Sequence, residues 1–393
     1  MLDNTPSPVI SLCQRQMGYV MLLTVMVLCG LGLVTLFSIA NPQNDPKMYA
    51  FAVQQARFMA LGAVACVIFA CIDYHVLLRY APAAVLLAVL LLALCFVPGI
   101  GKATNGASRW INVVGFSFQP SELAKISLIL FLAAYMSSRN GNSRDFLRGF
   151  LVPSVVTGII ALPIQKSPDL GTTLLVVLIF MSIMFAAGAR PVYLISMVFV
   201  GMGYILYSAV MIRNRWERIL AFLNPEDETF SLGRNYQVLQ GLIALGSGGM
   251  SGVGLGMSRQ KMSYLPECHT DFIFPIIGEE LGMFVTLGVV LAYFLFAICG
   301  CWIAVHAPDN GGFFLGIGIT CLITLQAMMN MFVVTNLMPN KGLPLPFISY
   351  GGTSLLFSLI AVGILFNLHR QGIAGEKPGN SGVVLPERSS PRM

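Results

Sequence analysis

Long uncharged apolar runs constrain the fold of this chain more than any other feature. Several of them approach 20 residues, which is enough for a helix to cross a hydrocarbon core about 30 Å thick. Only 10% of the 393 residues are charged and 56% are hydrophobic, whereas a soluble domain usually carries about 25% charged residues. The sequence therefore predicts an all-α polytopic membrane protein, and we expect no soluble domain.

The apolar runs predict about ten transmembrane helices, with a large extracytoplasmic loop before the eighth. The predicted spans are 17–40, 51–72, 76–97, 121–136, 150–165, 170–187, 190–212, 272–305, 312–336 and 350–368. An even number puts both termini on one side, and the bias of Lys and Arg in the short loops assigns that side to the cytoplasm. We expect residues 1–16 to be a cytoplasmic segment, 17–369 the membrane domain and 370–393 a disordered cytoplasmic tail.

The large loop contains two segments of distinct character. In "RNRWERILAFLNP", Trp216 shares a broad apolar helical face with Leu220, while the arginines lie largely opposite. This pattern favours an interfacial helix, with a solvated loop helix as the alternative. Residues 241–256 hold seven glycines but do not satisfy GxGxxG, so we expect tight turns or close backbone packing rather than a nucleotide site.

Ionisable residues near the predicted spans are candidates for function, because charges at membrane depth are costly. Glu122 and Lys125 lie three residues apart at the start of the fourth span; they form a structural ion pair or line an outward-facing cavity. Asp169 either caps the sixth span or faces a substrate. Glu279 and Glu280 are adjacent and point about 100° apart on a helix, so at least one is expected to be structural or neutral.

The segment "NKGLPLPFISYGGTSLL", 340–356, cannot be a regular helix, because Pro344 and Pro346 interrupt it. Irregular backbone at membrane depth is tolerated only where protein or a water-filled cavity covers it. We therefore expect a re-entrant or cavity-lining loop that carries Lys341 and Ser349, with a structural turn as the alternative.

The segment "YLPECHTDFIF", 264–274, places Glu267, His269 and Asp271 where the chain enters the eighth span. Asp271 could act as a general base toward a lipid-embedded substrate, or it could cap the helix. The eighth span is long enough to kink at Pro275 or to project past the membrane. No Cys/His spacing typical of a metal site occurs.

Five motifs together resemble the SEDS family of bacterial cell-wall synthesis, whose members are FtsW, RodA and SpoVE. They are "WINVVGFSFQPSELAKISLILFLA", "SPDLGTT", "RILAFLNP", "YLPECHTDFIFPIIGEELG" and "NKGLPLPFISYGGTSLL". The resemblance runs from about residue 17 to 369, and "SRQKMSYLPECHTDFIF" looks more like the FtsW subfamily than RodA. Cys268, where a small residue is usual, and Pro275 depart from the family pattern.

The resemblance implies a ten-span peptidoglycan glycosyltransferase that polymerises lipid II and releases undecaprenyl pyrophosphate. The family's essential aspartate maps onto Asp271. Cations, or a divalent metal such as Mg²⁺, are expected to meet the leaving pyrophosphate. The candidate cations are Arg109, Lys125, Arg218, Arg234 and Lys341, and the other candidate substrate-binding residues are Glu122, Asp169, Glu267 and Ser349.

The resemblance also implies a partner, a class B penicillin-binding transpeptidase (FtsI-like), together with other divisome proteins at the septum of the bacterial inner membrane. No nucleic acid is expected as a partner. A lipid II flippase, a RodA-like polymerase for elongation and a scaffold are the alternative functions. Asp271 discriminates among them, because a carboxylate at the outer surface suits chemistry there, whereas a flippase places its key charges near the midplane.

Overall fold

The computed structural model describes residues 8–40, 46–98, 101–104, 107–113, 116–138, 143–211, 220, 222, 236–262 and 265–375. Most of these residues are helical. The helices are α1 (Pro8–Ile39), α2 (Pro46–Cys71), α3 (Tyr74–Arg79), α4 (Ala81–Leu94), α5 (Pro120–Ser137), the π-helix η1 (Phe146–Leu151), α6 (Val152–Lys166), α7 (Leu170–Ala186), α8 (Pro191–Met211), α11 (Tyr236–Ser247), α12 (Ile273–Val305), α13 (Asn310–Val334) and α14 (Gly352–Gly375).

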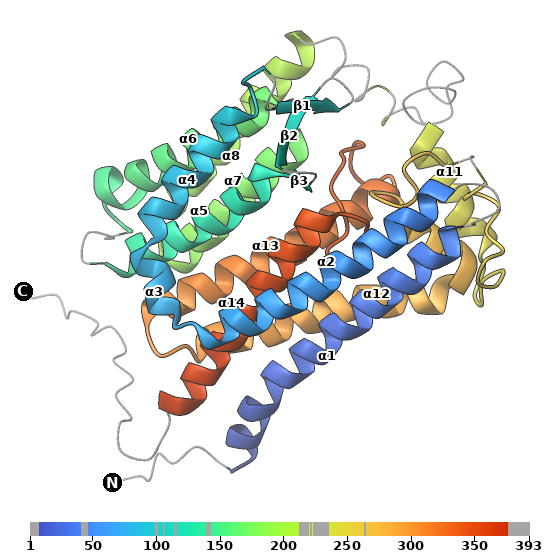
Figure 1. The fold of residues 1–393 in the computed structure, drawn as a ribbon. Helices are drawn as coiled ribbons and strands as arrows, with labels where there is room; N and C mark the ends of the chain where they lie inside the picture. The colour runs from blue at the N-terminus through green and yellow to red at the C-terminus, as the bar shows by residue number, and fades with distance from the viewer. Residues whose placement is uncertain are drawn as a thin grey trace, which may run out of the picture.

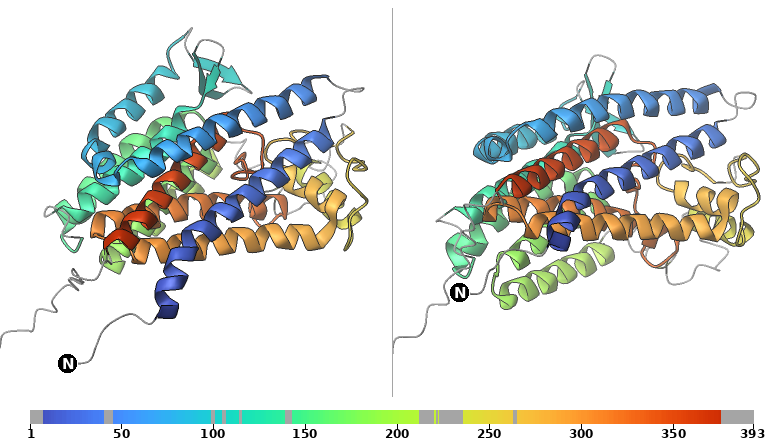
Figure 2. Two further views of the ribbon diagram at one scale, coloured as in Figure 1. Left: turned by 60° about the horizontal axis from the view of Figure 1, so that its bottom comes forward. Right: turned by 90° about the horizontal axis from the view of Figure 1, so that it is seen from below.

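The long helices run side by side in one bundle (Figures 1 and 2). α13 lies in its interior, where it packs against α5, α7 and α12, while α14 packs along α2 and α1 along α12. Within the described residues, seven helices are long and apolar enough to cross a membrane, and three shorter apolar helices accompany them. The chain is therefore a multi-pass membrane protein, as predicted, while the number of ten spans stays a prediction.

Helix ends differ from the predicted spans in a few places. The third predicted span is divided into α3 and α4, and the fifth begins with η1 before continuing as α6. α1 begins at Pro8, so the predicted N-terminal segment is partly helical. α14 continues to Gly375, so the expectation of disorder from residue 370 was wrong for its first residues.

A small antiparallel sheet stands between α4 and α5, which the prediction of a purely helical fold did not include. Its strands β1 (Gly101–Thr104), β2 (Ala107–Val113) and β3 (Phe116–Phe118) pair in the order β1-β2-β3. The sheet lies at one end of the bundle (Figure 1). It matters for the site because β2 carries Arg109.

Helix α12 bends at Gly282 and not at Pro275, where a kink was one of the two alternatives that the sequence left open. Pro275 lies in the first turn of α12, where no intrahelical partner exists for a backbone N–H, so it causes no break. Gly282 has φ 80° and ψ −177°. A side chain here would lie 2.4 Å from the Gly252 nitrogen, so the bend depends on glycine because the glycine-rich segment packs directly against it.

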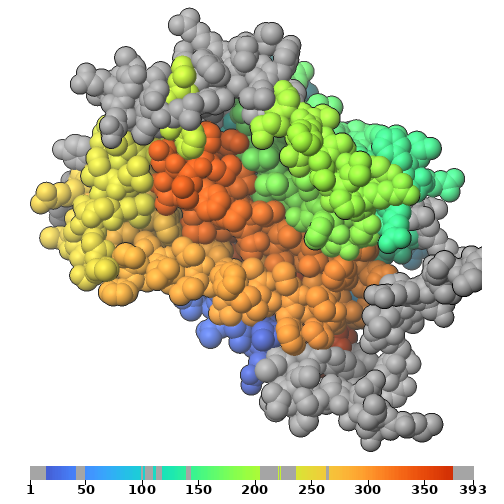
Figure 3. Space-filling model, turned by 180° about the vertical axis from the view of Figure 1, so that it is seen from behind, coloured from blue at the N-terminus to red at the C-terminus, as the bar shows by residue number. Residues whose placement is uncertain are grey.

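Two buried glutamates anchor the chain before α12 to this bend. Glu279 accepts a hydrogen bond from the Ser258 hydroxyl, and Glu280 pairs with the Lys261 ammonium at 3.0 Å. Glu280 also accepts a hydrogen bond from the Ser38 hydroxyl at the end of α1. Both carboxylates are therefore structural, which agrees with the expectation for at least one of them. This region forms much of the face seen in Figure 3, where α12 runs beside the segment 236–262.

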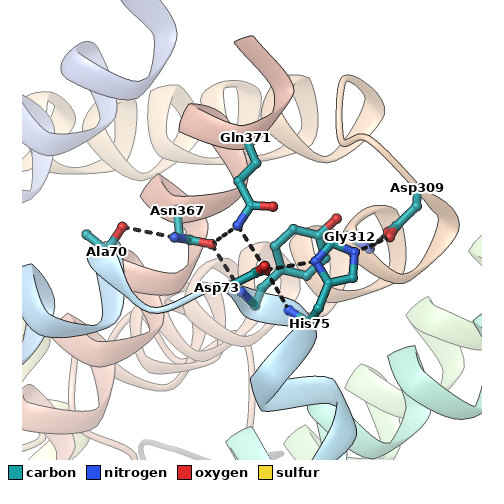
Figure 4. Close-up of polar contacts among 8 residues, drawn as sticks. Ala70, Asp73, His75, Asp309, Gly312, Asn367 and Gln371 are labelled. Carbon is teal, nitrogen blue, oxygen red and sulfur yellow. Dashed lines mark hydrogen bonds and ion pairs between the residues drawn. The ribbon is translucent and has the colours of Figure 1, made fainter. Parts of the chain in front are cut away.

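At the other end of the bundle, a polar cluster joins α3, α13 and α14 (Figure 4). Asp73 caps α3, and the His75 ring lies between Asp73 at 2.7 Å and Asp309 at 2.8 Å. Asp309 in turn caps α13, and Gln371 of α14 donates to Asp73. The His75 imidazole thus joins the caps of α3 and α13, and α14 is attached to the same cluster through the bond from Gln371 to Asp73.

Candidate active site

Asp271 lies immediately before α12, and its carboxylate is not a helix cap. The N-cap residue of α12 is Phe272, which has no side-chain capping bond. Within the part of the chain that the structure describes, no residue donates a hydrogen bond to the Asp271 carboxylate, and the side chain is partly exposed. The capping role that the sequence left open for Asp271 is therefore wrong, and the carboxylate remains available for chemistry.

The surroundings of Asp271 make its carboxyl group a weaker acid than usual. Burial, together with the nearby Glu267 and Asp169 carboxylates, raises its pKa to about 7, and the positive charge of Arg109 partly opposes this rise. The chain at Gly342 approaches closely, because a Cβ atom there would lie 2.7 Å from Asp271 Oδ2. A carboxylate that titrates near neutral pH is suited to accept a proton in catalysis.

Arg109 reaches from β2 to the link between α6 and α7. Its Nε and Nη2 donate to the carbonyls of Ser167 and Pro168 at 3.0 and 2.7 Å, and its Nη1 lies 3.9 Å from Asp169 Oδ2. Asp169 caps α7 by accepting from the Thr172 nitrogen at 3.0 Å. The capping role of Asp169 is thus confirmed, and it places a carboxylate–guanidinium pair within electrostatic range of Asp271.

Glu267 supplies the second negative charge near Asp271 from the same loop. Its side chain is exposed, and its backbone has φ 55°, a left-handed conformation that is uncommon for a residue other than glycine. The Thr270 hydroxyl donates to the Glu267 carboxylate at 3.1 Å. The structure therefore brings Arg109, Asp169 and Glu267, all predicted from the sequence, to one carboxylate.

Glu122 and Lys125 form an ion pair in the bundle interior. The Lys125 ammonium lies 2.9 Å from Glu122 Oε1 and donates to Gln326 Oε1 at 2.9 Å, and only 2% of the Lys125 side chain is exposed. The cavity beside the pair measures about 10 Å³, which is room for one water molecule at most. The structural alternative therefore holds for this pair, and Lys125 reaches no space in this conformation that fits a pyrophosphate.

The loop from Asn340 to Gly351 is irregular and largely buried by protein, as predicted. The Ser349 hydroxyl accepts from the Leu345 nitrogen at 2.8 Å, and Gln55 of α2 donates to the Ser349 carbonyl at 3.0 Å. Ser349 thus stabilises the turn of the loop, which is the structural alternative. Lys341 is half-buried at its start. Arg218, Arg234 and the predicted interfacial helix lie outside the described residues, apart from two single positions at 220 and 222.

Two site residues were not predicted, because the sequence was searched for ionisable side chains and these two, on α13, are neutral amides. Gln326 donates to the Pro344 carbonyl at 2.9 Å, and Asn330 donates to the carbonyls of Asp271 and Leu343 at 2.8 and 2.7 Å. The signal in the sequence was their i, i+4 spacing in an otherwise apolar helix, which places both on one face.

The described side chains near Asp271 do not form a cluster of metal ligands. Among the described residues, no group of three or more His, Cys, Asp or Glu side chains is arranged to hold a metal ion. Mg²⁺ is usually held by one or two carboxylates together with substrate phosphates, so the expected divalent metal stays a prediction.

The fold and the site define a class: multi-pass membrane proteins whose candidate catalytic carboxylate stands where the chain enters the bilayer. Residues 19–373 match the family model described as "Cell cycle protein", FTSW_RODA_SPOVE. The chain belongs to this family, which confirms the resemblance found in the sequence.

Two curated relatives illustrate the similarity. A "Probable peptidoglycan glycosyltransferase FtsW" of Geobacter metallireducens is 40% identical over 352 residues, covering 89% of this chain and 93% of the relative. "Stage V sporulation protein E" of Bacillus subtilis is 37% identical over 356 residues, covering 89% and 96%.

Two solved structures share the fold. A chain from "Structural coordination of polymerization and crosslinking by a peptidoglycan synthase complex" has a TM-score of 0.74 at 23% identity, covering 90% of this chain and 97% of that one. The rod shape determining protein RodA of Thermus thermophilus has a TM-score of 0.66 at 25% identity, covering 89% and 95%.

Proposed function

We propose that this protein is a peptidoglycan glycosyltransferase of the FtsW type, which polymerises lipid II into glycan strands. The observation that carries the proposal is the Asp271 carboxylate, which lies at the start of α12, accepts no hydrogen bond from the described residues and has a pKa raised to about 7. The relatives at 40% identity are named as probable peptidoglycan glycosyltransferases FtsW, which supports this chemistry and the division role.

The reaction assigned to the site is glycosyl transfer between two lipid-linked sugars. Asp271 takes the proton from the 4-hydroxyl of an acceptor GlcNAc, whose oxygen then bonds to C1 of a donor MurNAc. The bond between C1 and the pyrophosphate oxygen breaks, and undecaprenyl pyrophosphate leaves with both electrons of that bond. The carboxylates of Glu267 and Asp169 favour the protonated form of Asp271 and so help it to hold the proton it receives.

Among the described residues, Arg109 is a cation within electrostatic range of Asp271. About a third of its side chain is exposed, so its guanidinium can face negative charge that develops on a leaving pyrophosphate. Lys341 is a second candidate on the loop that passes Asp271.

The position of Asp271 suits substrates that keep their lipid chains in the bilayer. The membrane-spanning helix α12 begins at Ile273, two residues further along the chain. A sugar attached to a polyprenyl chain emerges from the bilayer at this level. A base placed deeper would be separated from the hydroxyl by the hydrocarbon region.

The proposal places the protein in the bacterial cytoplasmic membrane at the division septum, with its termini in the cytoplasm. Its proposed partner is a class B penicillin-binding transpeptidase, FtsI-like, alongside other divisome proteins. Two points support this: a structural neighbour comes from a complex that coordinates polymerization and crosslinking, and the described residues form a membrane bundle with a small sheet, without a separate domain for cross-linking.

The test is lipid II polymerisation by the purified protein and by Asp271→Asn, each with and without the transpeptidase. Asparagine keeps the shape of the side chain but cannot take the proton, so polymerisation should fall by about 10²–10⁴-fold. Thermal stability and co-purification with the partner serve as controls and should be retained. Polymerisation by Asp271→Asn within a few fold of the wild type would contradict the proposal. So would lipid II transport without polymerisation by the wild type, which would favour a flippase.

A further inference from the structure

Two amide side chains on α13 hold the irregular loop before α14 against the segment that carries Asp271. Gln326 and Asn330 are one helical turn apart on the same face. Gln326 donates to the Pro344 carbonyl, and its oxygen accepts from Lys125. Asn330 is 1% exposed and donates from its single nitrogen to the carbonyls of both Asp271 and Leu343.

The Asn330 amide is the point at which three separate parts of the chain meet. A carboxamide nitrogen carries two N–H donors, and here each one is directed to a carbonyl of a different segment. The Tyr350 nitrogen makes a second bond between the same two segments, to the His269 carbonyl at 2.9 Å. Because Gly342 precedes Leu343, the bonds of Asn330 also hold the backbone at Gly342, which approaches the Asp271 carboxylate so closely that a Cβ there would lie 2.7 Å from Oδ2.

The unpaired oxygen of Asn330 shows that this residue is not present for packing alone. Among the described residues, Asn330 Oδ1 is buried and has no hydrogen-bond partner. Burying an unsatisfied acceptor is unfavourable, and an apolar residue of similar size would avoid that cost. The gain that offsets it is the pair of bonds made by the nitrogen.

We propose that Asn330 is a positioning residue for glycosyl transfer, which sets the Asp271 carboxylate against the loop 340–351 by holding both backbones at once. This inference rests on the proposed function and adds a residue to it. Asn330 touches neither the carboxylate nor the reacting atoms, and it acts through the backbone of Asp271. A displacement of about 1 Å at a catalytic group is enough to cost about 10²-fold in rate.

The test replaces Asn330 by leucine, which has a similar size and no donor. The matched control is Asn367→Leu on α14, in the polar cluster drawn in Figure 4. Asn367 is also buried, and it donates to the Ala70 carbonyl at 2.9 Å and accepts from the Tyr74 nitrogen at 3.2 Å. Both substitutions therefore remove a buried asparagine that joins two segments, but only one of them removes a bond to Asp271.

Lipid II polymerisation by the purified proteins, in complex with the transpeptidase, gives kcat and KM at several pH values. For Asn330→Leu we expect kcat to fall by about 10- to 100-fold with KM within twofold of the wild type. The pH midpoint of kcat should move toward lower pH, because a released Asp271 is better hydrated. For Asn367→Leu, kcat and KM should stay within twofold of the wild-type values, and the pH midpoint of kcat should not shift.

Amide hydrogen exchange provides a readout that does not depend on activity. In Asn330→Leu, the segments 265–271 and 342–349 should exchange faster, while the rest of the bundle is unchanged. If the wild type does not polymerise lipid II, the proposed function fails, and the exchange measurement still tests the contact. If Asn330→Leu does not fold, Asn330→Ser, which keeps one short donor, replaces it with the same expectations.

The proposal is overturned if a folded Asn330 variant keeps kcat within twofold of the wild type and an unshifted pH midpoint. It is also overturned if Asn367→Leu loses kcat to the same extent, because a general loss of stability would then explain both variants. Unchanged exchange in the two segments would show that other contacts hold them.

Discussion

The pH dependence of polymerisation follows from the charges around Asp271, and Glu267 is the residue with which to change it. The general base works in its ionised form, so activity should be full above its pKa and lost as pH falls through it. Burial raises this pKa to about 7, and the negative charge of Glu267 contributes to the rise. Glu267→Gln removes that charge with little change of shape, so the midpoint should move to lower pH.

The size of the effect can be worked from the ionisation of a single carboxyl group. With a pKa of about 7, the ionised fraction is about 10% at pH 6, about 50% at pH 7 and about 90% at pH 8. The wild-type rate should therefore rise about fivefold from pH 6 to pH 7 and about twofold more to pH 8. An aspartate with its ordinary pKa near 3.9 would give a flat profile over this range.

The assay is the initial rate of lipid II polymerisation at saturating substrate between pH 5.5 and 8.5, at constant ionic strength. Glu267→Gln should retain more of its maximal rate at pH 6 than the wild type does. Arg109→Gln, which removes the opposing positive charge, should shift the midpoint the other way. A wild-type rate that does not change between pH 6 and pH 8, or the same midpoint in all three proteins, would refute this account of the base.

Three further predictions concern packing and charge. Gly342→Ala places a methyl group 2.7 Å from Asp271 Oδ2, so polymerisation should fall by about tenfold or more with little change in melting temperature; unchanged kinetics would contradict the close approach. Lys261→Met leaves Glu280 buried without its cation, which should destabilise the protein by about 3–5 kcal/mol, and Lys261→Met combined with Glu280→Gln should recover part of this in thermal unfolding. Burial lowers the pKa of His75, but hydrogen bonds to two carboxylates outweigh burial and raise the pKa above its ordinary value. The stability that this cluster contributes is therefore present below the ordinary pKa of histidine and is lost as pH rises through the raised pKa. His75→Gln should remove this pH dependence of the melting temperature.

The fold was largely predictable because the bilayer requires helices to satisfy their own backbone groups. Apolar runs therefore marked the helices, as in 121–136 for α5 and 170–187 for α7. The small sheet was not predicted, although the Asn105-Gly106 pair between alternating residues is a hairpin signal. A kink in α12 was expected only at Pro275, as one of two alternatives, because a proline inside a helix breaks it; in the first turn, where Pro275 lies, a proline has no such effect.

The candidate site was predictable only where charge revealed it. Asp271, Glu267, Asp169 and Arg109 were found as costly ionisable groups, and the structure gathers them. Lys125 met the same criterion but is engaged in a buried pair. A charged residue in an apolar segment is either paired with an opposite charge or functional. The sequence alone does not distinguish the two cases, because it does not show which side chains lie next to the charge in the fold.

Asn330 and Gln326 remained unnoticed for the opposite reason. Neutral amides carry a smaller penalty in a membrane helix than charges do, so they stand out little against an apolar background. Their importance comes from the backbone carbonyls they meet, and every residue has such a carbonyl. Side-chain chemistry alone could not identify which carbonyls those would be.

The irregular loop between α13 and α14 has a consequence for how the protein is made. Its backbone is covered by side chains from α2, α12 and α13, and α14 packs along α2 beside it. During synthesis, the segments that carry Arg109, Asp169 and Asp271 emerge from the ribosome well before residues 340–351. The Asp271 carboxylate is therefore synthesised long before the loop 340–351 that packs beside it. A nascent chain inserted in the membrane stays inactive until this loop and α14 have packed into the bundle.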